Sequence, residues 1–127
     1  MKDEFITFET AKLAKEKGFD EYCKYHFDQE GARFNNNMNP TKNSEWNNCM
    51  TQPTQSLLQR WLREQHNIYV ECIHTTLNTL DVISNYCNIY DYKNHHYITQ
   101  LNPVETKFHN DYTQALEEGL CEALKLI

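Results

Sequence analysis

The chain has 127 residues, a formal net charge of −6, 39% apolar residues and 13% aromatic residues. This length is close to the commonest size of one domain, so we expect a single domain over residues 1–127. No stretch approaches the roughly 18 consecutive apolar residues that a membrane-spanning helix needs. The opening residues lack the apolar run of a secretory signal. A cytoplasmic protein without a membrane partner is therefore expected.

The five cysteines are scattered singly and their number is odd, so no complete disulfide framework can be drawn. Reduced thiols are the simplest interpretation. The 18 acidic residues exceed the 12 basic ones, and this excess would repel a polyphosphate unless the basic side chains gathered on one face. Generic nucleic-acid binding is disfavoured.

The first predicted element is a helix over residues 8–17. Thr7 can act as its N-cap, because a threonine oxygen accepts a hydrogen bond from a free backbone N–H of the first turn. Gly18 can end the helix in the left-handed conformation. Phe19 would then fold back toward the last turn, as in a Schellman motif.

A hairpin is expected over residues 22–34, where aromatic residues surround a turn at Glu30 and Gly31. The following residues, 35–52, are so polar that they offer little apolar surface to offset the entropy of ordering. We expect a mobile loop there, with Trp46 as an anchor.

A second helix is predicted to follow Pro53, which suits a first-turn position because it has no N–H to lose, and to run to about Gln65. Asn67 is a plausible left-handed stop. The inward face of this helix is expected to contain Leu57, Leu58, Trp61 and Leu62.

Residues 68–97 are rich in Ile, Val, Thr and Tyr and break near residues 76–79 and 93–94. This pattern predicts three short antiparallel strands. The elements together predict an α+β fold, in which an antiparallel sheet of about five short strands packs against three amphipathic helices. An edge strand of that sheet could pair with a second copy to form a homodimer.

The last helix is expected to begin at Asp111, whose carboxylate can cap the first turn. Gly119 in its middle costs roughly 1 kcal/mol relative to alanine. That cost is understandable if the helix backbone lies close against the sheet. The predicted buried stripe consists of Leu116, Leu120, Ala123, Leu124 and Ile127.

Histidines and cysteines suggest catalytic or metal chemistry only weakly. Zinc needs three or four convergent ligands, and adjacent His95 and His96 would point to opposite faces of a strand. Cys72 and His74 would share a face, but nothing nearby supplies further ligands. We predict no catalytic residues, no metal and no cofactor. A small hydrolase or metal-dependent enzyme using His74, His95 or His109 with a carboxylate is the alternative.

Binding residues are more plausible candidates. Two arginines lie three residues apart on the second helix and could form an anion-binding edge with Lys42 or Arg33, although a solvated helix face is the simpler explanation. Tyrosines provide a large contact area with a polar tip, although packing within the sheet would also account for them. The candidate ligand-binding residues are Arg60, Arg63, Trp46, Tyr86, Tyr90, Tyr92 and Tyr97.

Three segments resemble small uncharacterised proteins of phages and prophages from gut anaerobic bacteria. They are TQSLLQRWLRE at residues 54–64, FITFETA at residues 5–11 and YTQALEEGL at residues 112–120. With their flanking residues they cover roughly half of the chain. The resemblance implies a phage or mobile-element origin and no particular activity. The chain departs from the group at QLNPVE, residues 100–105, where members often have a glycine-rich acidic loop.

These observations favour a non-enzymatic accessory protein encoded by a phage. Its partner would be a host protein or a small molecule, so it could inhibit a host defence protein or sequester a signalling molecule. A structural or assembly protein is the remaining alternative.

Overall fold

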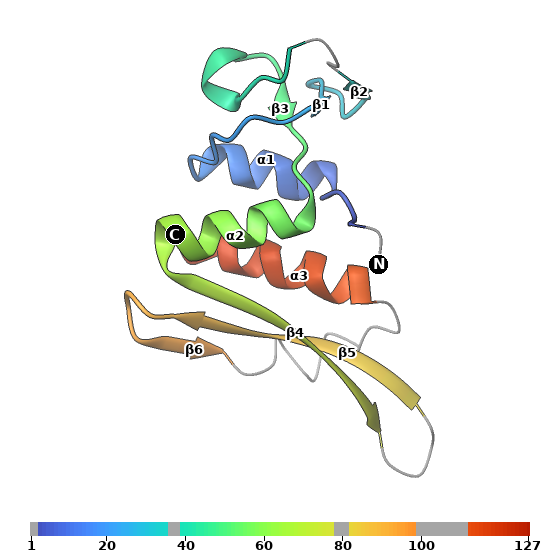
Figure 1. Cartoon of the computed structure of the whole chain (residues 1–127), viewed down its shortest axis with the longest axis vertical. Helices are drawn as coiled ribbons and strands as arrows, with labels where there is room; N and C mark the ends of the chain where they lie inside the picture. The colour runs from blue at the N-terminus through green and yellow to red at the C-terminus, as the bar shows by residue number, and fades with distance from the viewer. Residues whose placement is uncertain (1–2, 36–38, 78–81, 99–111) are drawn as a thin grey trace. The chain divides into compact units, whose positions relative to one another are not determined.

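The computed structural model describes residues 3–35, 39–77, 82–98 and 112–127. The fold is α+β, with the element order α1, β1, β2, the short 3₁₀ helix η1, β3, α2, β4, β5, β6 and α3 (Figure 1). It divides into two compact units, Met1–Leu58 and Gln59–Ile127. The expectation of a single domain stays a prediction. No helix in the described ranges is long and apolar enough to cross a membrane.

The described strands form two antiparallel sheets of three strands each, with the orders β2-β1-β3 and β4-β5-β6. The prediction of one sheet with about five strands was therefore wrong. The predicted hairpins are present, but the hairpin near the N-terminus pairs with a two-residue strand instead of joining the later hairpin. Two separate sheets result.

Helix α1 (Phe8–Glu16) begins and ends as its sequence predicts. The Thr7 side chain accepts a hydrogen bond from the Thr10 N–H, and Gly18 is left-handed with φ +93°. The Gly18 N–H donates to the Lys15 carbonyl and the Phe19 N–H to the Ala14 carbonyl. These two bonds are the pair that defines a Schellman motif.

The N-terminal hairpin consists of β1 (Tyr25–Phe27) and β2 (Arg33–Asn35). Its turn is held by Asp28, whose carboxylate accepts hydrogen bonds from the N–H groups of Glu30 and Ala32. Gly31 has φ +91° there, and a Cβ on it would approach the Phe8 ring to 3.1 Å. The predicted hairpin and its turn are confirmed.

Residues 39–52 contain two elements that composition does not predict, η1 (Asn43–Glu45) and β3 (Met50–Thr51). A buried asparagine explains why these two elements form in so polar a stretch. The Asn43 side chain donates to the Phe19 carbonyl at 2.8 Å and accepts from the Thr51 N–H at 3.0 Å. The one buried amide of Asn43 thus provides hydrogen-bond partners for two backbone groups, which apolar side chains could not do.

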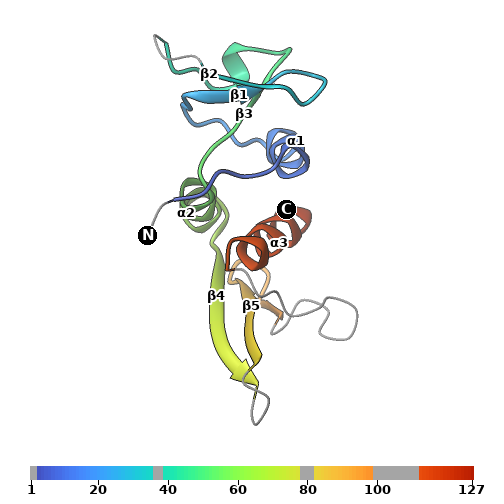
Figure 2. The same ribbon diagram turned by 90° about the vertical axis from the view of Figure 1, so that its right-hand side faces the viewer.

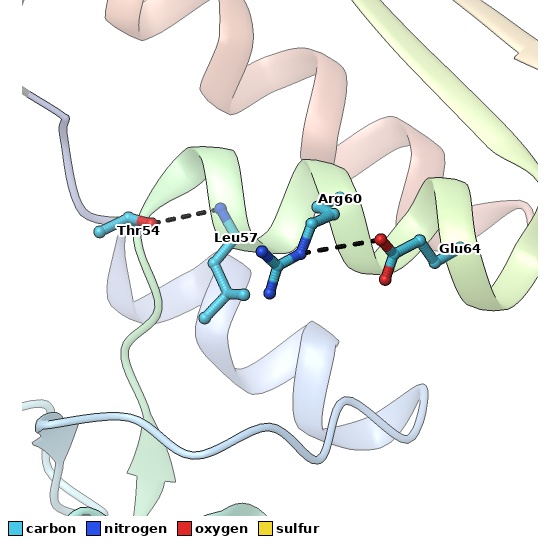
Figure 3. A network of polar contacts seen from close by, with 4 residues as sticks. All are labelled: Thr54, Leu57, Arg60 and Glu64. Carbon is cyan, nitrogen blue, oxygen red and sulfur yellow. Dashed lines mark hydrogen bonds and ion pairs between the residues drawn. The ribbon is translucent and has the colours of Figure 1, made fainter.

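Helix α2 (Gln55–His66) has Thr54, not Pro53, at its start (Figure 3). The Thr54 hydroxyl accepts a hydrogen bond from the Leu57 N–H at 3.2 Å. Pro53 therefore precedes the cap, where its carbonyl accepts from the Ile6 N–H. At the other end Asn67 is left-handed with φ +56°, as predicted.

The second unit contains a three-stranded sheet and helix α3 (Tyr112–Lys125). The strands are β4 (Ile68–Leu77), β5 (Val82–Asp91) and β6 (His96–Ile98). The three predicted strands are confirmed, although β4 and β5 have ten residues each instead of being short. Asp111, the predicted cap of α3, lies outside the described residues.

Helix α3 packs on one face of β4 and β5 (Figures 1 and 2). A Cβ on Gly119 would lie 2.7 Å from Cys87 Sγ and 3.0 Å from Val70 Cγ1. The helix backbone is thus as close to the sheet as the glycine suggested. Buried α3 side chains include four of the five predicted ones, Leu116, Leu120, Ala123 and Leu124, while Ile127 is partly exposed.

Candidate functional site

The two faces of the β4–β5 hairpin differ in their surroundings. Val70 and Cys87 face α3 and are almost completely buried. Because successive strand side chains alternate between faces, Tyr69 on β4 and Tyr90 on β5 lie on the opposite face. The register places these two tyrosines directly across from each other.

Four tyrosines of the described residues gather on or beside this opposite face, and we call them the tyrosine face: Tyr69, Tyr86, Tyr90 and Tyr92. The Tyr69 and Tyr92 rings meet edge to face with centroids 5.2 Å apart. The Tyr90 and Tyr92 rings are nearly parallel at 5.8 Å and 7°. Edge-to-face and offset parallel contacts are the favoured geometries of aromatic pairs.

Tyr92 is the most accessible member of the tyrosine face, with 53% of its surface exposed. It begins the turn between β5 and β6, and its N–H donates to the Asn67 carbonyl at 3.2 Å. The preceding Asp91 is buried and accepts two hydrogen bonds from Asn94 across the turn. His95 completes the turn with φ +54°. A hydrogen-bonded turn therefore supports the exposed ring.

The structure brings together three of the four predicted tyrosines. Tyr86 and Tyr90 share a face of β5, and Tyr92 contacts Tyr90. Tyr97 is placed opposite Tyr90 in the β5–β6 register, and its side chain lies outside the described part of the chain. Sequence reasoning missed Tyr69. The break near residues 76–79 held the signal, because a hairpin closed there pairs Tyr69 with Tyr90.

No family model matches the chain, and no curated protein or solved structure matches it either.

Glu71 on β4 follows Tyr69 by two positions and shares its face. Glu71 is exposed. Its carboxylate adds negative charge to a surface that already presents the electron-rich faces of tyrosine rings. A cationic group would be attracted by both features.

The predicted arginine edge has a different character in the structure. Arg60 and Glu64 form an i, i+4 pair on α2 with Nε and Oε1 4.0 Å apart, and both side chains are more than half exposed (Figure 3). Arg63 is exposed on the same helix. Arg33, a suggested partner, instead stacks on the Tyr25 ring at 4.0 Å and donates to Gln52. Arg33 therefore has partners within the first unit.

Trp46 belongs to the first unit and is 37% exposed. Its ring contacts Phe34 and His26, with centroids 5.5 and 5.7 Å away. His26 is buried and its Nε2 bonds to the Thr41 hydroxyl at 2.5 Å. Burial lowers the pKa of His26, so the ring is neutral at pH 7. This arrangement anchors residues 39–52 to the hairpin, as expected for Trp46.

Of the histidines considered for metal or acid–base chemistry, only His95 has a described side chain. His95 is an exposed turn residue, and His109 lies outside the described residues. His74 and His96 are strand residues whose side chains also lie outside them. Among the side chains that are described, no group of three or more His, Cys, Asp or Glu residues could hold a metal ion.

An open depression of about 460 Å³ lies in the first unit and is lined by Asp28, Gln29, Glu30, Asn48 and Cys49. The Asp28 carboxylate already accepts two backbone hydrogen bonds. Burial raises the pKa of the Cys49 thiol, which disfavours a nucleophilic thiolate. The tyrosine face is the better candidate site.

Proposed function

We propose that this chain is a non-enzymatic accessory protein of a phage that binds a host protein through the tyrosine face. The observation that carries the binding function is the Tyr69–Tyr90–Tyr92 cluster, with its exposed ring on a supported turn. Tyrosine is enriched at protein interfaces because it combines apolar area with a hydroxyl group. The phage origin rests on the resemblance of three sequence segments.

The partner is expected to present arginine or lysine side chains to this surface. Tyrosine ring faces attract cations, and Glu71 lies beside them. The net charge of −6 would also steer a basic partner toward the chain at low ionic strength. A basic patch on a host defence protein fits these properties.

Site-specific photocrosslinking in a lysate of a gut anaerobe tests the proposal. A benzophenone amino acid would replace Tyr92 in one variant and Tyr22 in a matched control. Tyr22 is 58% exposed and belongs to the other unit. We expect a discrete protein adduct from position 92 only, and its loss when Tyr69→Ser is added.

Two results would contradict the proposal. Identical adducts from both positions would indicate nonspecific contact. Release of a small planar molecule on denaturation, with no protein adduct, would assign the tyrosine face to ligand sequestration instead.

A further inference from the structure

Two of the five cysteines are direct neighbours across the β4–β5 hairpin. The register pairs Cys72 with Cys87. Both residues are on the face toward α3, where Cys87 Sγ lies against Gly119 and donates to the Ala115 carbonyl at 3.1 Å. Singly scattered cysteines in the sequence thus become one thiol pair in the fold.

The hydrogen-bond pattern of the hairpin shows whether Cys72 and Cys87 form a hydrogen-bonded or a non-hydrogen-bonded pair of the ladder. The Tyr92 N–H donates to the Asn67 carbonyl, so Asn67 and Tyr92 form a hydrogen-bonded pair. Hydrogen-bonded and non-hydrogen-bonded pairs alternate along an antiparallel ladder. Counting along the register makes Tyr69–Tyr90 hydrogen-bonded and Cys72–Cys87 non-hydrogen-bonded.

Non-hydrogen-bonded pairs are the closer ones, with Cα atoms about 4.5 Å apart. Disulfides need Cα separations of about 4.4–6.8 Å. The hairpin therefore holds the two cysteines at a separation that a disulfide can span without strand rearrangement.

The two thiols differ in accessibility and in acidity. Cys87 is 2% exposed, whereas Cys72 is half-buried. Once Cys72 has lost its proton, the Cys87 thiol can donate to the Cys72 sulfur instead of to the Ala115 carbonyl, and this hydrogen bond lowers the pKa of Cys72. The same bond together with burial raises the pKa of Cys87. The negative charge is better solvated on Cys72, the more accessible sulfur. The Cys72 thiolate is thus suited to attack an external disulfide, and Cys87 is suited to attack the mixed disulfide that forms on Cys72.

We propose that Cys72 and Cys87 form a reversible redox modification site, which closes to a cross-strand disulfide on reaction with a low-molecular-weight disulfide such as glutathione disulfide. This site is independent of the proposed binding function.

The reaction takes place in two exchanges. The Cys72 thiolate attacks one sulfur of glutathione disulfide, so that a mixed disulfide forms and one glutathione thiolate leaves with the bonding electron pair. Cys87 then loses its proton to solvent and attacks Cys72 Sγ, which releases the second glutathione thiolate. The two protein thiols are oxidised by two electrons and glutathione disulfide is reduced to two glutathione molecules.

The experiment uses the full chain in glutathione redox buffers, with acid quenching, alkylation in denaturant and peptide mass spectrometry. We expect a Cys72–Cys87 linked peptide that disappears on reduction. Cys87→Ala should trap the mixed disulfide on Cys72, whereas Cys72→Ser should leave Cys87 unmodified. Cys121→Ser, a control at a partly exposed α3 thiol, should form the linked peptide as the parent does.

A second measurement needs no variant. In the native chain, iodoacetamide should alkylate Cys72 at least ~10-fold faster than Cys87, since thiolate character and access control the rate. Glutathionylation that stops at Cys72 in the parent chain, or equal alkylation of both thiols, would overturn the proposal.

Discussion

Gly119→Ala gives the sharpest test of how α3 lies on the sheet. The added Cβ would meet Cys87 Sγ at 2.7 Å, Cys87 Cβ at 2.8 Å and Val70 Cγ1 at 3.0 Å. Favourable contacts between carbon atoms occur at about 3.5–4.0 Å. The helix or the strand would therefore have to move by roughly 0.5–1 Å to admit one methyl group.

Two opposing free energies determine the outcome. Alanine is better than glycine in a helix interior by about 1 kcal/mol. Overpacking a core costs about 1–3 kcal/mol. Because two of the close contacts involve a strand side chain near its backbone, we place the cost in the upper half of that range. The free energy of unfolding should fall by about 1–2 kcal/mol.

Urea unfolding followed by circular dichroism measures this change, and a double-mutant cycle identifies its cause. In a Cys87→Gly background both contacts with Cys87 vanish, so the loss caused by Gly119→Ala should shrink by at least about half. A stabilised Gly119→Ala variant would refute the close packing. A penalty unchanged in the Cys87→Gly background would show that another contact causes it.

Three further predictions concern the described side chains, each measured by urea unfolding. Thr54→Ala should lower the free energy of unfolding by about 1 kcal/mol, because the N-cap of α2 is lost. Arg60→Ala should change it by no more than about 0.5 kcal/mol, because the ion pair with Glu64 is exposed. Similar losses in the two variants would contradict the role of Thr54 as the cap. Asn43→Ala should cost about 2–3 kcal/mol, since two buried backbone groups lose their partner; a neutral result would show that water replaces the amide. Burial lowers the pKa of His26 in the folded chain. As the pH falls below about 6.5, this histidine therefore takes up a proton in the unfolded chain before it does so in the folded chain. The free energy of unfolding should then decline, with a slope of at most about 1.4 kcal/mol per pH unit. His26→Gln should flatten that decline between about pH 7 and 5, and an unchanged profile would place its cause elsewhere, as at His66, whose pKa is also lowered.

Helix ends were predictable because each depends on a few neighbouring residues. Thr7 and Gly18 fix α1 through bonds that span at most five positions, and Asn67 ends α2 through its own backbone conformation. The start of α2 shows the limit of this reasoning. Both Pro53 and Thr54 suit a helix start, and only the bond to the Leu57 N–H distinguishes them.

The division into two sheets was not predictable from periodicity. Strand β3 has two residues within a polar stretch and no alternating pattern of its own. Its pairing with β1 depends on Asn43, which joins Phe19 and Thr51 across 24 and 8 positions of sequence. Local patterns identify hairpins, but they do not specify which strand completes each sheet.

The sequence predicted that tyrosines form the candidate site, but it did not identify all of the tyrosines in it. Tyrosine enrichment indicated Tyr86, Tyr90 and Tyr92, and the pairing of Tyr69 with them required the register of β4 against β5. The thiol pair was missed for the same reason. Cys72 and Cys87 are 15 positions apart, and no spacing rule relates them without a hairpin closed between them.

One register therefore determines both faces of the hairpin. The pairing that sets Tyr69 opposite Tyr90 also sets Cys72 opposite Cys87, and a shift by one residue would exchange the buried and exposed sides of one strand. Formation of the Cys72–Cys87 disulfide would consequently establish the register on which the tyrosine face depends, while leaving its partner to the crosslinking experiment. Conversely, a partner bound at Tyr92 would say nothing about the thiols, because they lie on the opposite face of the sheet, toward α3. The two proposals share their geometry and can fail separately.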